Sequence, residues 1–205
     1  IRRLLAEKRV ARLVTTRTHR LQPASAPKQL RQDLRLNNGL GGFSADGREY
    51  VITTTLENQT PLPWVNVLAN AQFGSVVAES GLAYTWSENA HEFRLTPWSE
   101  DTVGASGGEA FYLRDEETGY FWSPSPMPSR GATPYVTRHG FGYSVFEHSE
   151  GGIQSELCVY VDLHDAVKFS VLKVRDHSGR SRRLSATGYV EWILGDLRPK
   201  SALHV

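Results

Sequence analysis

The stretch YVTRHGFGYSVFEH at residues 135–148 decides the fold class, together with the two runs that follow it, IQSELCVYVDL at 153–163 and AVKFSVLKVRDHSG at 166–179. Each run is short, either alternates apolar with polar residues or is largely apolar, and is punctuated by turn-forming residues such as glycine. Runs of this kind with turn signals between them are typical of β-strands. All three are therefore predicted to be strands.

The same pattern extends outward in both directions. Toward the N-terminus it continues in REYVITTTLEN at 48–58, FGSVVAES at 73–80 and LAYTWSE at 82–88. EAFYLRDEETGYFWS at 109–123 predicts a hairpin, because a polar turn separates two aromatic runs. RRLSATGYVEWILG at 182–195 places Val190, Trp192 and Leu194 on one face of a strand. Eight or more strands, with a turn roughly every 8 to 15 residues, predict an all-β sandwich.

The first 35 residues follow a different pattern. IRRLLAEKRVARLV at 1–14 spaces apolar residues at partly helical intervals among arginines and lysines, which predicts a short amphipathic helix. The polar segment that follows is interrupted by Pro23 and Pro27. We therefore expect an N-terminal helix or linker arm over 1–35 and a β-sandwich domain over 36–205. Because the only methionine is Met127, we expect this chain to be a fragment of a larger enzyme.

Composition narrows the class of protein. At 205 residues the chain is long enough for one large domain that buries roughly 70% of its unfolded surface. No run of about 18 apolar residues occurs, so no membrane span is expected. The 23 basic and 22 acidic residues leave a net charge of +1, which argues against nucleic acid as a partner. The single cysteine, Cys158, excludes an internal disulfide and is expected to be a buried structural thiol.

Short motifs indicate no metal or nucleophile chemistry. NNGLGGF at 37–43 lacks the lysine and hydroxyl residue of a phosphate loop and precedes a strand, so a tight chain reversal is the better interpretation. No HExxH or GxSxG pattern occurs, and no metal site is expected. A pair of glycosidase carboxylates stays open, because their separation in space decides that question.

Two proline-containing stretches have structural interpretations. In TPLPWVNVLAN at 60–70, Trp64 is expected in the core, and Asn66 and Asn70 bond either loop backbone or sugar hydroxyls. SPSPMP at 123–128 is expected to be a surface loop of polyproline type.

TWSENAHEFRLTPW at 85–98 combines two tryptophans with an arginine, a histidine and two glutamates. Aromatic faces offer apolar contacts to sugar C–H groups, while arginine and carboxylates orient hydroxyls. The stretch is therefore either a sugar-binding rim or a packed corner of a β-domain.

Five sequence segments, taken in order, resemble those of a known protein family, and the resemblance covers about residues 36–195. The segments are NNGLGGFSADGREYVI, TPLPWVNVLANAQFGSVVAESGLAYTWSENAHEFRLTPWSED, GEAFYLRDEETGYFWSPSP, YVTRHGFGYSVFEH and YVEWILG. Together they resemble the N-terminal β-domain of the glycoside phosphorylase family that contains cellobiose phosphorylase. The resemblance is closest to the branch of cyclic β-1,2-glucan synthases and 1,2-β-oligoglucan phosphorylases.

This resemblance implies a β-supersandwich of the galactose-mutarotase-like type. Members of the family act on β-glucosidic bonds by inverting phosphorolysis, with the catalytic aspartate and the phosphate-binding residues in a following (α/α)6 barrel. It therefore implies no catalytic residue and no cofactor in this chain, with inorganic phosphate bound elsewhere. The implied partners are a β-glucan oligosaccharide and that barrel, and the resemblance allows a homodimer. It also implies a cytoplasmic-facing soluble domain and allows a parent in a bacterial inner membrane.

Loops of such a domain help to shape the sugar site of the barrel. The candidates for rim and interface roles are Trp86, Arg94, Trp98 and Asp101, with Arg114 and His139 as further candidates. Two alternatives remain open. One is a freestanding carbohydrate-binding module. The other is a mutarotase-like sugar enzyme, in which His139 would work with Glu147, or His148 with Glu156.

Overall fold

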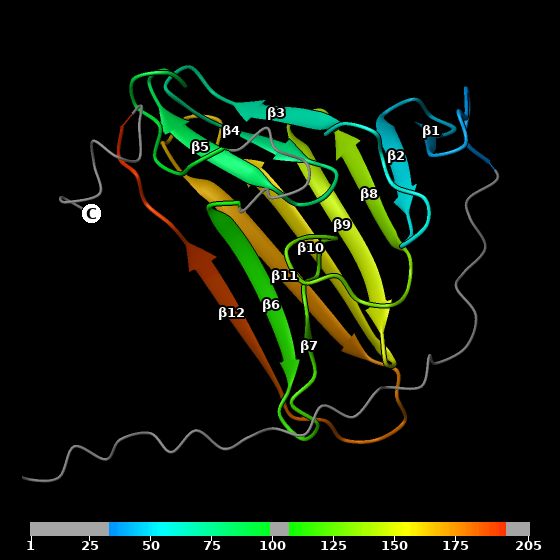
Figure 1. Ribbon diagram of the computed structural model, residues 1–205. Helices are drawn as coiled ribbons and strands as arrows, with labels where there is room; N and C mark the ends of the chain where they lie inside the picture. The colour runs from blue at the N-terminus through cyan, green and yellow to red at the C-terminus, as the bar shows by residue number, and fades with distance from the viewer. Residues whose placement is uncertain (1–32, 99–106, 196–205) are drawn as a thin grey trace, which may run out of the picture.

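The computed structural model describes residues 33–98 and 107–195 (Figure 1). Within these residues the chain forms twelve strands, β1 to β12, and no helix. The predicted all-β class is confirmed for this part of the chain. The helix expected within 1–14 lies outside the described residues, and the domain boundary at residue 36 stays a prediction.

The strands form three antiparallel sheets. The large sheet has the order β1 (Gly41–Phe43), β2 (Glu49–Thr54), β8 (Tyr135–Gly140), β9 (Tyr143–Glu150), β10 (Ile153–Val161) and β11 (Lys168–Asp176). The sheet that we call the β4 sheet has the order β3 (Val65–Ala69), β4 (Phe73–Ala78) and β5 (Ala83–Ser87). The β6 sheet has the order β12 (Leu184–Val190), β6 (Glu109–Asp115) and β7 (Phe121–Trp122).

Both small sheets lie over one face of the large sheet and share its core (Figure 1). Strand β10 shows why, because its odd-numbered residues from Ile153 to Val161 are buried and the even-numbered residues between them are only half-buried. The main cluster joins the β4 sheet to the large sheet through Leu68, Phe73, Val77, Ala83, Phe146, Leu157, Val159 and Val161. A second cluster joins the β6 sheet to β10 through Leu113, Trp122 and Ile153. The described part of the chain is therefore a sandwich of one large and two small sheets.

The runs predicted as strands contain β2, β4 to β6 and β8 to β12, and the hairpin over 109–123 is confirmed as β6 and β7. The run at 135–148 forms two paired strands, β8 and β9, rather than one. The reversal predicted in NNGLGGF is also confirmed. Asn38 Oδ1 accepts hydrogen bonds from the amides of Leu40 and Gly41, at 3.0 and 2.9 Å. The short strand β1 then follows, and a Cβ at Gly41 would lie 2.6 Å from the Val51 carbonyl oxygen. Strands β1 and β3 were not predicted.

The strand predicted over 182–195 ends earlier, at Val190. The Ile193 amide donates to the Leu95 carbonyl at 2.9 Å, and the Gly195 amide donates to the Arg94 carbonyl at 2.7 Å. The chain thus leaves the β6 sheet and joins the segment after β5. Leu194 has a φ of 45°, which ends the alternation on which the prediction rested.

The surface loop expected at 123–128 is wrong for residues 123–126, which are buried. Ser123 is fully buried and Ser125 is 4% exposed. Burial is tolerated because proline has no amide donor to satisfy and because the Ser123 carbonyl accepts from the Tyr135 hydroxyl at 2.9 Å. Gly81 makes room for this segment, since a Cβ there would lie 2.4 Å from Ser125.

Asn66 and Asn70 bond loop backbone, as one of the two interpretations predicted. The Asn66 amide donates to two carbonyls that flank the β8–β9 turn, both at 2.9 Å. The Asn70 amide donates to two carbonyls of the β10–β11 connection, at 2.9 and 2.8 Å. Trp64 and Cys158 were expected in the core, but both are only half-buried. Burial nevertheless raises the pKa of the Cys158 thiol.

Candidate functional site

Three of the predicted site residues converge on a residue that the sequence analysis did not single out, Tyr84. Strand β5 places Tyr84 and Trp86 on one face, with ring centroids 5.6 Å apart. The Trp98 ring lies 5.4 Å from Tyr84, and the Arg94 guanidinium carbon lies 4.9 Å from the centre of the Tyr84 ring. That geometry is a cation–π contact. We call these four residues the Tyr84 cluster.

The loop after β5 folds so that Arg94 returns beside Trp86. Asn89 Oδ1 accepts hydrogen bonds from two backbone amides of this loop, at 3.0 and 2.7 Å. Trp86 and Arg94 then form an antiparallel bridge. Gly74, the cross-strand neighbour on β4, lets the Trp86 ring lie against the strand, because a Cβ there would sit 2.3 Å from that ring. The local sequence therefore fixes the cluster.

All four side chains of the Tyr84 cluster are half-buried. Their rings contribute to packing and still offer part of their surface to a partner. Aromatic faces with a neighbouring guanidinium suit a sugar, because the faces meet C–H groups and the guanidinium donates to hydroxyls. The same surface also suits a packed protein partner. Both interpretations of residues 85–98 thus find support in one arrangement.

Neither Arg114 nor His139 belongs to the Tyr84 cluster. Arg114 lies on β6, cross-strand from Phe121, with its Nε 3.9 Å from the Glu116 carboxylate. Asp101 lies outside the described residues. The predicted site residues that the structure describes are therefore divided among the Tyr84 cluster, the β6 sheet and the large sheet, where His139 lies on β8.

His139 is engaged inside the fold. Its Nδ1 lies 2.9 Å from Ser144 Oγ and its Nε2 lies 3.1 Å from the Trp64 carbonyl oxygen. Burial lowers the pKa of the imidazole and outweighs the opposite effect of that carbonyl. Both ring nitrogens thus tie β8 to its surroundings, and His139 acts as a structural joint.

The histidine–glutamate pairs of the mutarotase-like alternative do not form. Glu147 pairs with Arg138 at 3.1 Å, and Glu156 pairs with Lys173 at 2.8 Å. His148 instead lies 3.3 Å from Glu150, and the two side chains are 0% and 5% exposed. A sugar cannot reach a pair buried so completely. The structure therefore gives this alternative no accessible catalytic pair from these residues.

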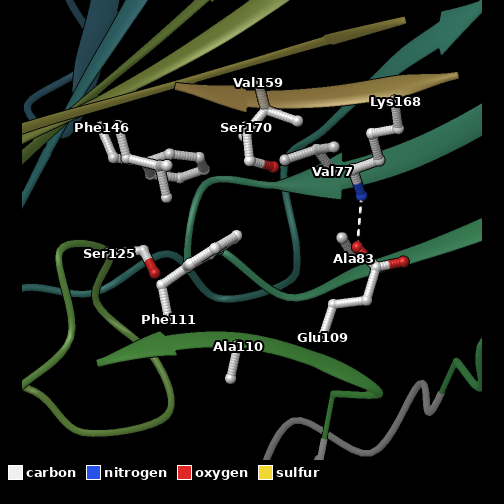
Figure 2. Close-up of a pocket in the computed structure, with 12 residues that line it drawn as sticks. Val77, Ala83, Glu109, Ala110, Phe111, Ser125, Phe146, Val159, Lys168 and Ser170 are labelled. Atoms are coloured by element: carbon white, nitrogen blue, oxygen red, sulfur yellow. Dashed lines mark hydrogen bonds and ion pairs between the residues drawn. The ribbon is translucent and has the colours of Figure 1, made fainter. Parts of the chain in front are cut away.

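A polar cluster lies where the three sheets meet, beside a small cavity (Figure 2). Lys168 from β11 forms an ion pair with Glu109 from β6 and donates to Ser75 Oγ at 2.9 Å. Glu109 also accepts hydrogen bonds from the hydroxyls of Thr85 and Thr96, at 2.6 and 2.8 Å. We call these five residues the Glu109 joint.

The Glu109 joint is a structural feature rather than a ligand site. Burial acts to raise the pKa of Glu109, but the Lys168 charge and the hydrogen bonds outweigh it and hold that pKa below its usual range. The adjoining cavity has a volume of about 20 Å³, room for roughly one water molecule, whereas small-molecule pockets span about 300 Å³ or more. The joint was not predicted from the sequence. Lys168 at an inward-facing position of a strand was the available signal.

Two kinds of feature are absent from residues 33–98 and 107–195. No three histidine, cysteine, aspartate or glutamate side chains there gather closely enough to hold a metal ion. No helix in that part of the chain is long and apolar enough to cross a membrane.

Comparison with known proteins resolves the family. A family model described as glycosyl hydrolase 94, supersandwich domain, matches residues 48–205. The chain belongs to the glycosyl hydrolase 94 family. The three-sheet architecture is thus a supersandwich of this family, and the resemblance found in the sequence is confirmed.

Glycosyl hydrolase 94 relatives include both synthases and phosphorylases. The chain is 39% identical over 174 residues to the cyclic beta-(1,2)-glucan synthase NdvB of Rhizobium meliloti, covering 84% of this chain and 6% of that protein. It is 30% identical over 167 residues to the N,N'-diacetylchitobiose phosphorylase of Vibrio furnissii, and 31% identical over 163 residues to the solabiose phosphorylase of Paenibacillus borealis. These matches cover 80% and 76% of this chain, and 20% of each phosphorylase. The chain therefore spans a small part of each relative.

Proposed function

We propose that this chain is the non-catalytic, carbohydrate-associated β-sandwich of a β-glucan-processing enzyme, either a cyclic β-1,2-glucan synthase or a related phosphorylase. Membership of glycosyl hydrolase 94 and the similarity to a glucan synthase support this proposal. The observation that carries it is the Tyr84 cluster, in which the half-buried Tyr84 ring contacts the rings of Trp86 and Trp98 and the guanidinium of Arg94. That combination recognises sugars better than it catalyses their cleavage.

We further propose that the Tyr84 cluster packs on a following (α/α)6 barrel and completes the rim of its sugar site. Trp86 and Trp98 would contact the C–H faces of a glucose unit, and Arg94 would donate to its hydroxyls. Two backbone hydrogen bonds from residues 193–195 to residues 94–95 support a fixed position for this loop. A rim that is held in place loses less entropy when the sugar binds.

The test compares this chain with the longer protein that contains it. We expect no phosphorolysis of β-1,2-glucan oligosaccharides by the chain alone, and activity in the longer protein. In the longer protein, Trp98→Ala should raise KM about tenfold, which corresponds to roughly 1.4 kcal/mol of lost binding. Phe93→Ala is the matched control, because Phe93 is 52% exposed on the same loop and lies outside the Tyr84 cluster. Phosphorolysis by the isolated chain, or an unchanged KM in Trp98→Ala, would contradict the proposal.

A second candidate function is that of a freestanding carbohydrate-binding module. The partial exposure of the Tyr84 cluster in this chain favours it, because no partner is needed to form the cluster. Titration calorimetry of the isolated chain with β-1,2-glucan oligosaccharides distinguishes the two functions. Binding that Arg94→Lys weakens while the chain stays folded would favour the module, because lysine keeps the charge and loses the planar stacking group.

A further inference from the structure

One row of side chains crosses five strands on the outer face of the large sheet. Its members are cross-strand neighbours in register, in the order Glu49 (β2), Gly140 (β8), Tyr143 (β9), Tyr160 (β10) and Phe169 (β11). Ser144 and Val159, which alternate with the two tyrosines, are buried on the opposite face, under the small sheets. Adjacent strands lie about 4.8 Å apart, so the row is roughly 20 Å long. We call it the Tyr143 row.

The Tyr143 ring lies flat on the sheet over Gly140. A Cβ at Gly140 would sit 2.3, 2.6 and 2.8 Å from three carbons of that ring, so glycine is required beneath it. The Tyr143 hydroxyl donates to the Glu49 carboxylate at 2.8 Å. Asn66 Nδ2 donates to the carbonyls of Gly140 and Tyr143, both at 2.9 Å. The ring is thus held in place with one face on the sheet and the other face turned outward.

The same arrangement occurs in the Tyr84 cluster, where Gly74 lets the Trp86 ring lie against β4. The two rings lie on opposite faces of the sandwich, because Trp86 is on the outer face of the β4 sheet and Tyr143 is on the outer face of the large sheet (Figure 1). A flat aromatic ring with one open face suits the C–H groups of a pyranose. The Tyr84 cluster accounts for only one of these two surfaces.

Two further aromatic rings extend the surface beside Tyr143. The rings of Tyr160 and Phe169 stack with centroids 5.1 Å apart and planes inclined by 19°. Tyr160 is half-buried, and Phe169 is 40% exposed. The pair is therefore ordered by its own stacking and still offers apolar area to a partner.

The charges beside the Tyr143 row are compensated. Arg138 pairs with Glu49 at 2.5 Å and with Glu147 at 3.1 Å, and Glu156 pairs with Lys173 at 2.8 Å. A charged partner gains little from groups that are already paired, so this surface is complementary to an uncharged one. The phenol oxygen of Tyr143 can also accept a hydrogen bond from a hydroxyl group. A neutral, hydroxyl-rich oligosaccharide meets both conditions.

We propose that the Tyr143 row is a second carbohydrate-binding surface, which holds a β-glucan chain on the face of the sandwich opposite the Tyr84 cluster. The choice of β-glucan as the ligand rests on the proposed function, whereas the geometry of the row does not. Pyranose units lie on the outward face of the Tyr143 ring and along the Tyr160–Phe169 pair. A glucan long enough to reach both surfaces is retained better than a short one, because binding at one surface raises the effective concentration at the other.

Calorimetric titration of the Trp98→Ala chain with β-1,2-glucan oligosaccharides isolates the Tyr143 row, because this substitution removes a ring of the Tyr84 cluster. Binding should persist in that background. Adding Tyr143→Leu should weaken Kd about tenfold, as expected for the loss of an aromatic anchor. Phe169→Leu is the second variant and should weaken Kd about threefold, and far-UV circular dichroism checks that each variant folds. Phe121→Leu is the matched control with no change expected, since Phe121 is 51% exposed on β7, on the other side of the large sheet.

The length of the glucan separates this proposal from the proposed function. In the longer protein, Tyr143→Leu should leave KM for short oligosaccharides unchanged and raise it for long ones. Trp98→Ala should raise KM for both. A failure of the Tyr143 row therefore leaves the role of the Tyr84 cluster intact, and the reverse also holds.

Three results would overturn the proposal. One is a Trp98→Ala chain that binds no oligosaccharide at concentrations up to about 10 mM. Another is a Kd that Tyr143→Leu and Phe169→Leu leave unchanged, or that Phe121→Leu weakens equally. The third is an unchanged KM for long glucans in Tyr143→Leu of the longer protein, which would mean that another part of the polypeptide covers the row.

Discussion

Strand β5 separates two clusters of opposite character. Thr85 points inward to the Glu109 joint and is 6% exposed, while its neighbours Tyr84 and Trp86 point to the other face and are half-buried. In the joint, the ammonium, the carboxylate and the hydroxyls satisfy one another. In the Tyr84 cluster, rings and a guanidinium keep part of their surface open. Successive residues of one strand thus contribute separately to a buried, satisfied polar cluster and to a partly exposed aromatic surface.

The largest effect is expected from a substitution in the Glu109 joint. Lys168→Met leaves the Glu109 carboxylate buried without its counter-ion, which should lower the free energy of unfolding by about 3–5 kcal/mol. Urea denaturation of the chain measures this loss. The double variant K168M/E109L should recover most of it, because a well-packed apolar pair replaces the ions. A single-variant loss below about 1 kcal/mol would mean that the pair behaves as a surface ion pair.

A smaller loss of stability is expected from a substitution at Gly74, which packs against the Tyr84 cluster. Gly74→Ala places a methyl group 2.3 Å from the Trp86 ring, so the ring must move. The expected loss of stability is about 1–3 kcal/mol, as for an overpacked site, with a shift in tryptophan emission. Gly188→Ala is the comparison, since its nearest contact, with Phe111, is 3.3 Å. Equal losses in the two variants would contradict the account of Gly74.

The smallest expected effect is a loss of folding stability at low pH. The pKa of Glu109 is lowered in the folded state, so its contribution to stability is complete above the unfolded value of 4.5 and is lost as pH falls through the folded pKa. Each unit of lowering corresponds to about 1.4 kcal/mol. Urea titrations between pH 7 and pH 3 should show this slope in the wild type and a shallower one in Glu109→Gln. The Tyr84 cluster contains no carboxylate, so Glu109→Gln should not change sugar recognition. An equal slope in the variant would contradict the assignment.

Sequence patterns predicted most strands because alternation and turn residues are local signals. They failed where contacts with residues distant in the sequence determine the local structure. The strand predicted through Leu194 ends at Val190, because the backbone turns to bond residues 94–95, about a hundred positions away in sequence. SPSPMP is buried in part because the Tyr135 hydroxyl satisfies a carbonyl within it.

The candidate site shows the same limit. Trp86, Arg94 and Trp98 were predicted from one short stretch, and they do lie together. Arg114 does not join them, because β6 belongs to another sheet. The Glu109–Lys168 pair joins residues 59 positions apart. A lysine at an inward-facing strand position was a local signal, but no local pattern could show which residue it meets. Tyr84 was overlooked because its importance comes from the rings around it.

The two roles proposed for β5 can be separated by substituting two neighbouring residues of that strand in the longer protein and measuring both stability and KM for β-1,2-glucan oligosaccharides. Tyr84→Leu should raise KM about tenfold and lower stability by no more than about 1 kcal/mol. Thr85→Val should leave KM unchanged and lower stability by about 1–3 kcal/mol, because Glu109 loses a buried hydrogen bond. If Tyr84→Leu instead leaves KM unchanged and destabilises the fold as much as Thr85→Val, the Tyr84 cluster is a packed corner and the proposed role in sugar recognition is wrong.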